Sequence, residues 1–123
     1  MTYRLTDASV KVRLNDVVLT YTTEGTEPTR GAVLYSTTFV SEAGDDVRQI
    51  GFKLLDSRLI ATFWSDHVSP MQYAAGPNVT PQRIGNTHTI VFPLEALGSI
   101  RAGSWHAILN VDGDDVDRVE GSL

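Results

Sequence analysis

The chain has 123 residues, the length of one ordinary domain, and 41% of them are hydrophobic, which is enough for one contiguous core. Fifteen acidic against ten scattered basic residues give a net charge of −5. Because phosphate binding needs clustered Lys and Arg, we expect no contact with nucleic acid or with an anionic membrane. The absence of cysteine excludes disulfides, thiolate metal ligands and a cysteine nucleophile.

No stretch of the sequence has the length and hydrophobicity of a signal peptide or of a bilayer span. We therefore expect a soluble protein without a membrane partner. The sequence leaves the compartment open between the cytoplasm and export after removal of a leader, and Met1 favours the cytoplasm.

In the first half of the chain, hydrophobic residues alternate with polar ones, and this period of two predicts strands with one buried face. Residues 8–14 and 17–23 flank Asn15-Asp16, whose side chains suit a tight turn, so these two strands are expected to form a hairpin. A loop over 24–30 separates the hairpin from a long strand. The next expected strands are 31–40, 49–54 and 58–64.

Residues 65–86 follow neither a strand nor a helix period and contain three prolines and two glycines, so we expect one long loop. Loops longer than about 15 residues are uncommon in compact domains and are usually functional. Beyond it, residues 94–98 predict a single helical turn closed by glycine. Asp112-Gly113 between alternating segments predicts a tight hairpin. The remaining expected strands are 87–92, 103–111 and 116–120.

About eight strands, with no helix of three turns, predict an all-β fold. We expect an antiparallel two-layer β-sandwich, immunoglobulin-like or jelly-roll-like, formed by residues 1–123 as a single domain. A closed barrel has the same alternation and remains an alternative. The residues expected in the core are Val10, Val12, Ile50, Phe52, Leu54, Phe63, Ile90, Phe92, Leu109 and Val111.

The run 97–113 resembles the last hairpin of immunoglobulin-like domains. In those domains a leucine and a glycine precede an aromatic residue that opens the penultimate strand, and a Val-Asp-Gly turn leads into the last strand. Here the run begins with Leu-Gly, Trp105 holds the aromatic position, and Val111-Asp112-Gly113 forms the turn. The resemblance implies a sandwich and no particular activity, because this fold hosts many functions.

Aromatic residues in and beside the long loop suggest a binding surface. Exposed Trp and Tyr near Asn and Asp bind sugar rings and protein partners, because the aromatic face is apolar and its edge is polar. For Trp64 the alternative is a place in the core, since it ends an apolar strand. The candidate binding residues are Trp64, Asp66, His67, Met71, Tyr73 and Asn78.

Asp66-His67, at the start of the long loop, offers a catalytic alternative. A histidine beside a carboxylate can act as a general base, and a pocket under the loop would then be an active site. Adjacent residues in a chain seldom point the same way, however, and no glycine-flanked nucleophile accompanies the pair. The three histidines lack metal-ligand spacing, so we expect no cofactor and no zinc site.

The acidic turn near the C-terminus invites a calcium hypothesis in which Asp112, Asp114 and Asp115 are ligands. The spacing required of an EF-hand loop fails from Asp112 and also from Asn110. A solvated acidic turn is the favoured interpretation, because runs of charge are usually solvated. An irregular calcium site stays open.

The leading functional hypothesis is a non-enzymatic binding module that contacts a partner protein or a saccharide through loop 65–86 and the adjacent strand edges. The alternatives are a small enzyme that uses Asp66 and His67, and a structural subunit of an assembly such as a homo-oligomer. A concave pocket with convergent polar groups would favour small-molecule chemistry. A flat apolar patch would favour a protein partner.

Overall fold

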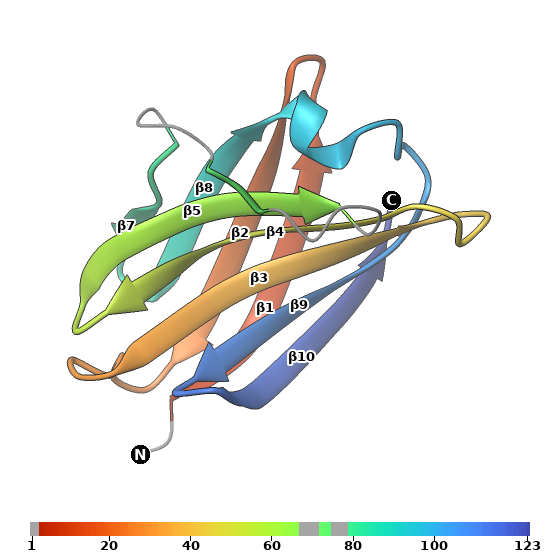
Figure 1. Cartoon of the computed structure of the whole chain (residues 1–123). Coiled ribbons are helices and arrows are strands. Elements are labelled where there is room, and N and C mark those ends of the chain that lie inside the picture. The colour runs from red at the N-terminus through yellow and green to blue at the C-terminus, as the bar shows by residue number, and fades with distance from the viewer. Residues whose placement is uncertain (1–2, 67–71, 75–78) are drawn as a thin grey trace.

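The structure, a computed structural model, describes residues 3–66, 72–74 and 79–123 (Figure 1). Alternating β-branched and aromatic residues form strands along most of the described chain, which contains ten strands and one turn of 3-10 helix. In chain order these are β1 Arg4–Val12, β2 Asp16–Glu24, β3 Ala32–Ser41, β4 Val47–Leu55, β5 Arg58–Asp66, β6 Gln72–Ala74, β7 Gln82–Ile84, β8 Thr87–Pro93, η1 Leu94–Leu97, β9 Gly103–Val111 and β10 Asp114–Ser122.

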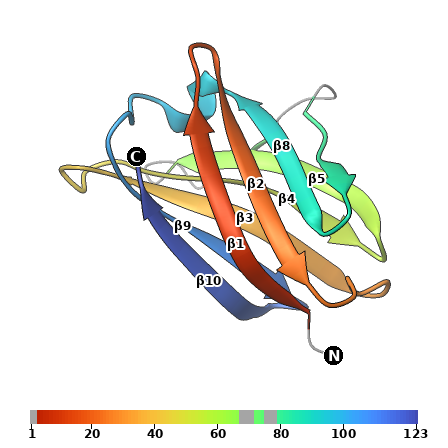
Figure 2. The same ribbon diagram turned by 180° about the vertical axis from the view of Figure 1, so that it is seen from behind.

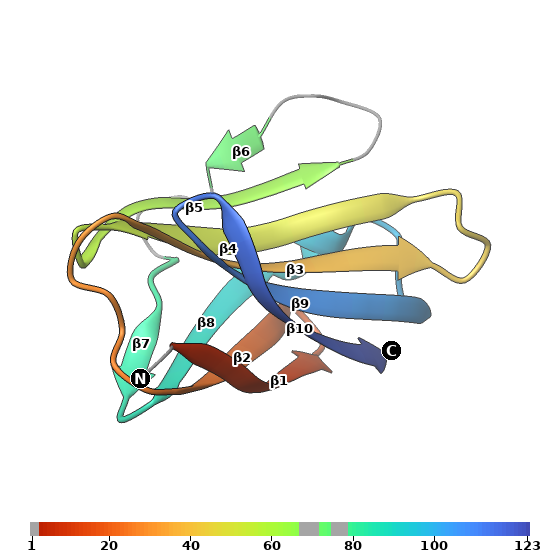
Figure 3. The ribbon, with the colours of Figure 1, turned by 90° about the horizontal axis from the view of Figure 1, so that it is seen from below.

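The strands form two antiparallel sheets that pack face to face, which confirms the predicted sandwich. One sheet has the order β1-β2-β8-β7 and the other β10-β9-β3-β4-β5-β6. Seen end-on, the two sheets lie as separate layers (Figure 3). From behind, β1, β2 and β8 lie across the strands of the other sheet (Figure 2).

Two of the hairpins follow from their turn residues. Asp56 and Ser57, between β4 and β5, both have positive φ, as do Asp112 and Gly113 between β9 and β10. Two consecutive residues of positive φ give the turn whose twist matches that of antiparallel strands. The predicted Asp-Gly hairpin is therefore confirmed, and so is the helical turn that ends at Gly98.

On one side of the sandwich the edge strands of the two sheets, β1 and β10, are joined by polar contacts. Arg4 donates from Nε and Nη2 to the two carboxylate oxygens of Asp117, at 2.7 and 2.8 Å. The backbone N–H of Leu5 donates to the same carboxylate at 2.9 Å. These bonds satisfy edge groups that would otherwise be open to pairing with another chain.

The core lies between the two sheets and is rich in aromatic residues. Tyr35 stacks on Phe52 with ring centroids 4.7 Å apart, and Tyr21 meets both rings at an angle. The Tyr21 hydroxyl is buried and bonds the Thr37 hydroxyl at 2.7 Å, as a buried hydroxyl must find a partner. The predicted core residues that are buried are Ile50, Phe52, Leu54, Phe63, Ile90, Phe92 and Leu109.

Several boundaries of the sequence prediction need correction. Val10, Val12 and Val111 are only half-buried, although they pack against the core. The first strand ends before Leu14, which lies in the turn and is 88% exposed. Residues 65–86 are not one uninterrupted loop, because β5 extends to residue 66 and the short strands β6 and β7 each pair with a neighbouring strand.

Trp105 is buried in the core at the start of β9. It pairs in register with Gly121 of β10. A Cβ at position 121 would overlap the indole, so glycine is required there for steric reasons. No helix in the described part of the chain is long and apolar enough to cross a membrane.

Candidate functional site

A pocket of about 630 Å³ opens at one end of the sandwich, and we call it the end pocket. Its walls come from the loop after β2, from the β4–β5 turn, and from the segment that contains β7 and the start of β8. The lining residues are Gly25, Thr26, Glu27, Thr29, Leu54, Ser57, Leu59, Thr80, Pro81, Arg83, Asn86 and His88. The volume is in the range of pockets that bind small molecules.

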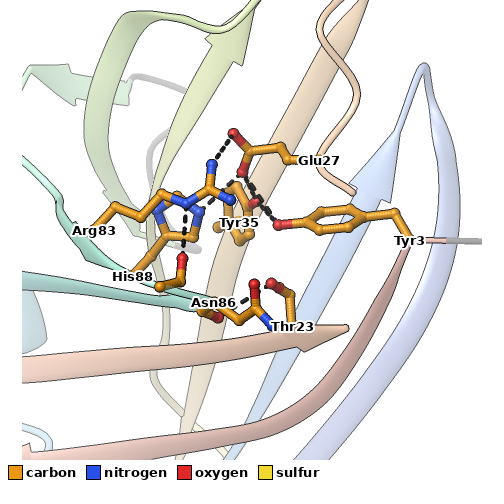
Figure 4. A network of polar contacts seen from close by, with 8 residues as sticks. Tyr3, Thr23, Glu27, Tyr35, Arg83, Asn86 and His88 are labelled. Atoms are coloured by element: carbon orange, nitrogen blue, oxygen red, sulfur yellow. Dashed lines mark hydrogen bonds and ion pairs between the residues drawn. The ribbon is translucent and has the colours of Figure 1, made fainter. Parts of the chain in front are cut away.

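The inner part of the end pocket is formed by a polar network centred on the Glu27 carboxylate (Figure 4). Glu27 Oε2 accepts hydrogen bonds from the hydroxyls of Tyr3 and Tyr35, the first at 3.1 Å. His88 Nε2 lies 2.9 Å from the same oxygen and, facing a carboxylate, donates to it. Arg83 Nη1 donates to Glu27 Oε1 at 3.2 Å. Four segments of the chain thus converge on one carboxylate, which is 9% exposed.

Local structure brings these residues to the same end of the sandwich. Tyr3 precedes β1, Glu27 follows β2, and His88 is the second residue of β8. The β7–β8 turn is tied to the end of β2, because the backbone N–H and the hydroxyl of Thr23 both donate to the Asn86 carbonyl, at 2.9 and 3.1 Å. This link fixes the β7–β8 turn, and with it Arg83 of β7, beside the loop that carries Glu27.

The network holds Glu27 as a carboxylate. Burial alone would raise the pKa of Glu27, but hydrogen bonds from His88 and Tyr35, together with the charge of Arg83, outweigh it and lower the pKa to about 2. Burial raises the pKa of the Tyr35 phenol, and its bond to Glu27 acts in the same direction. Burial likewise raises the pKa of Tyr3. The two phenols therefore serve as hydrogen-bond donors at neutral pH.

The imidazole of His88 is held from two directions. Its ring centroid lies 4.8 Å from that of Tyr35 and 5.7 Å from that of Phe52, and the side chain is almost fully buried. Nε2 is committed to Glu27. Ring packing and the hydrogen bond together fix the orientation of the imidazole, so His88 forms a rigid part of the pocket wall.

Arg83 is the charged residue of the network that reaches solvent. Its Nε donates to the Gly85 carbonyl at 3.0 Å, and its side chain is 44% exposed. Two anchored nitrogens hold the guanidinium plane in place. The other polar side chains that line the pocket carry hydroxyl or amide groups, namely Thr26, Thr29, Ser57, Thr80 and Asn86.

Trp64, the one predicted binding residue whose side chain the structure describes, does not line this pocket. Trp64 is half-buried and packs against the core, and its strand partner in register is Tyr73. Asp66 ends β5, whereas the pocket lies at the beginning of that strand. At ~3.3 Å per residue the two ends of a nine-residue strand are roughly 25 Å apart. His67, Met71 and Asn78 lie outside the described residues, so their roles remain predictions.

Two of the three carboxylates of the calcium hypothesis, those of Asp112 and Asp115, accept hydrogen bonds within the protein. Asp112 accepts from the backbone N–H of Ala32 at 2.8 Å, and Asp115 accepts from the Asn110 amide at 2.8 Å. Across residues 3–66, 72–74 and 79–123 no group of three or more His, Asp and Glu side chains is placed to hold a metal ion. The structure does not gather Asp112, Asp114 and Asp115 into a ligand set.

Sequence reasoning missed the residues that do converge, Glu27, Arg83 and His88. Glu27 is separated from Arg83 by 56 positions and from His88 by 61. One signal was available, because His88 has the alternation phase of Ile90 and Phe92 and therefore belongs to the buried face of its strand. A buried histidine requires a polar partner.

Comparisons with protein families, with curated proteins and with solved structures find no match. The assignment of a function therefore depends on the geometry of the end pocket.

Proposed function

We propose that this protein is a non-enzymatic binding domain whose end pocket takes a small, hydroxyl-rich molecule of the saccharide type. The observation that carries the proposal is the composition of the pocket wall. Four hydroxyl side chains and one amide surround it, Leu54, Leu59 and Pro81 supply apolar surface, and Arg83 and Glu27 are fixed inside. A sugar ring has the complementary character, with polar edges and an apolar face.

The geometry supports binding better than acid–base catalysis. A general base must accept a proton near neutral pH. The pKa of Glu27 is lowered to about 2, and both of its oxygens already accept hydrogen bonds. His88 Nε2 is bonded to Glu27, so it is not directed at a substrate. Such a network suits a rigid wall that orients a ligand.

We also infer that the sandwich is immunoglobulin-like and of the variable type. In that type a sheet with strands A-B-E-D packs on a sheet with strands G-F-C-C′-C″. Lettered along the chain, the orders β1-β2-β8-β7 and β10-β9-β3-β4-β5 correspond to these, with the short β6 added at the edge. The end pocket then lies among the B–C and C′–C″ loops, where variable domains bind their ligands. This analogy accompanies the proposal and does not carry it.

The test is a titration of the protein with D-glucose, D-galactose, N-acetyl-D-glucosamine and D-glucuronate, followed by backbone amide NMR. We expect shifts of the amides of Thr26, Ser57 and Asn86, with little change at the distant β1–β2 turn. Saturation with a millimolar dissociation constant would be usual for a single sugar unit in a small pocket. If none of the four sugars moves these amides, the proposal is wrong. If the moving amides cluster on β5 and β6, a different binding surface is indicated.

A further inference from the structure

The arrangement of donors around Arg83 bears on the chemistry of the ligand, and this inference rests on the proposed function of the end pocket. A guanidinium carries five N–H donors in a rigid plane. In Arg83 one of them bonds Gly85 and one bonds Glu27. Three N–H groups remain without a partner among the described residues, on a side chain that lines the pocket and is partly exposed.

The Glu27 carboxylate, unlike the Arg83 guanidinium, has little hydrogen-bonding capacity left for a ligand. Its Oε2 accepts from Tyr3, Tyr35 and His88, and its Oε1 accepts from Arg83. A ligand hydroxyl that reaches Glu27 must compete with these donors. Of the two charged groups, the one with open capacity is therefore the positively charged donor, and its complement is an acceptor that carries negative charge.

The charges that line the end pocket favour a carboxylate over a phosphate dianion as the ligand's anionic group. Among the described residues that line the pocket, the Arg and Glu side chains are one guanidinium and one carboxylate. A phosphate dianion would meet a single Arg with Glu27 beside it, in a protein of net charge −5. A carboxylate carries one charge and matches the two parallel N–H groups of a guanidinium. A ligand with one negative charge is therefore favoured over a dianion, which the Glu27 carboxylate would repel more strongly.

We propose that the end pocket is specific for an acidic sugar, a hydroxylated ring that bears one carboxylate, and that Arg83 binds this carboxylate. Glu27 and the Gly85 carbonyl hold the guanidinium in place before the ligand arrives. Such preorganisation reduces the entropy that a flexible arginine would lose on binding. The hydroxyls of Thr26, Thr29 and Thr80 remain for the ring.

The experiment compares D-glucuronate with D-glucose, D-glucuronamide and D-glucose 6-phosphate, by NMR titration of the wild-type protein. We expect glucuronate to bind about tenfold more tightly than glucose and glucuronamide, the ratio of a charge-assisted bidentate contact to a neutral one near solvent. Added sodium chloride should weaken glucuronate binding and leave glucose binding unchanged.

The variant Arg83→Gln should remove the preference for glucuronate over glucose, so that the ratio of the two dissociation constants falls to about one. Arg83→Lys keeps the charge without the planar fork and should retain part of the preference. Arg13→Gln, at the distant β1–β2 turn, is the matched control and should behave as wild type. A thermal melt of each variant establishes that the fold is intact.

The outcomes separate this inference from the proposed function. If all the sugars bind equally and Arg83→Gln changes nothing, the acidic-sugar assignment is wrong while the saccharide pocket stands. If glucose 6-phosphate binds more tightly than glucuronate, the preference for carboxylate is wrong. If no sugar binds to the wild-type protein, both proposals fail.

Discussion

Substitution of Glu27 by glutamine tests the network that forms the pocket wall. The change keeps the size of the side chain but removes its charge and replaces one acceptor oxygen by a donor. Whichever way the amide is turned, its NH₂ group faces donors: the guanidinium of Arg83 on one side, or the hydroxyls and imidazole on the other. At least one donor of the wild-type network then loses its acceptor.

The loss in the free energy of unfolding caused by Glu27→Gln can be obtained in two independent ways. A fall in the pKa of Glu27 from 4.5 to about 2 corresponds to about 3 kcal/mol of preference for the charged form in the folded state. Solvent at the pocket mouth screens part of this, which leaves about 2 kcal/mol. Loss of one hydrogen bond to a charged group costs about 1.5–3 kcal/mol. We expect Glu27→Gln to lower the free energy of unfolding by about 2–3 kcal/mol at neutral pH.

The assay is urea denaturation of both proteins between neutral pH and the lowest pH at which the wild type stays folded. Because the folded-state pKa of Glu27 is lowered, its stabilising contribution is complete above the unfolded-state pKa of 4.5 and is lost as the pH falls toward about 2. The difference between wild type and variant should therefore be constant above about pH 5 and shrink below pH 4.5. Glu42→Gln, an exposed carboxylate at the opposite end of the sandwich, is the control. A difference that does not change with pH would refute the reasoning.

Two further predictions concern the core and its tyrosines. Gly121→Ala places a methyl group against the buried indole of Trp105 and should lower the free energy of unfolding by about 1–3 kcal/mol in denaturant melts; wild-type stability would show that the indole can move aside. Burial raises the pKa of Tyr3, Tyr21 and Tyr35, so their contribution to stability is complete below the usual pKa near 10 and is lost as the pH rises above it. In a tyrosinate absorbance titration at about one pH unit above 10, Tyr21 and Tyr35 should stay protonated in the folded chain, whereas all four tyrosines should ionise after denaturation.

The parts of the fold that the sequence predicts are those specified by local rules. Eight long strands follow from alternation, and the last hairpin follows from Asp112 and Gly113, which both have positive φ. The errors occur where local rules are weak. Leu14 continues the phase of Val10 and Val12, but the chain turns before it. Strands β6 and β7 have three residues each, too few for a period of two to be recognised.

Local sequence patterns could not predict the candidate site, because its residues come from segments that are distant in the sequence. Glu27 lies in a loop whose sequence predicts only a break between strands. Tyr3, near the N-terminus, and His88, on β8, both donate hydrogen bonds to Glu27. They meet there because of the order of the strands in the two sheets, which the local sequence does not reveal. The prediction concentrated on residues 65–86 for their unusual length. The described C-terminal part of this segment contains Thr80, Arg83 and Asn86, which line the pocket.

A buried charged network stabilises a domain inefficiently, because burying its charges costs desolvation free energy. Replacing such a network by apolar residues of similar volume is often neutral or stabilising, whereas removing one partner is costly because it leaves the others unpaired. Stability alone therefore gives no reason for Glu27, His88 and Arg83 to occupy this position. Among the described residues no buried side-chain polar atom lacks a partner, so the arrangement is complete without a ligand. What an apolar replacement could not supply is a guanidinium held at two points with its outer donors free. That property fits the role in ligand binding that we propose for the end pocket.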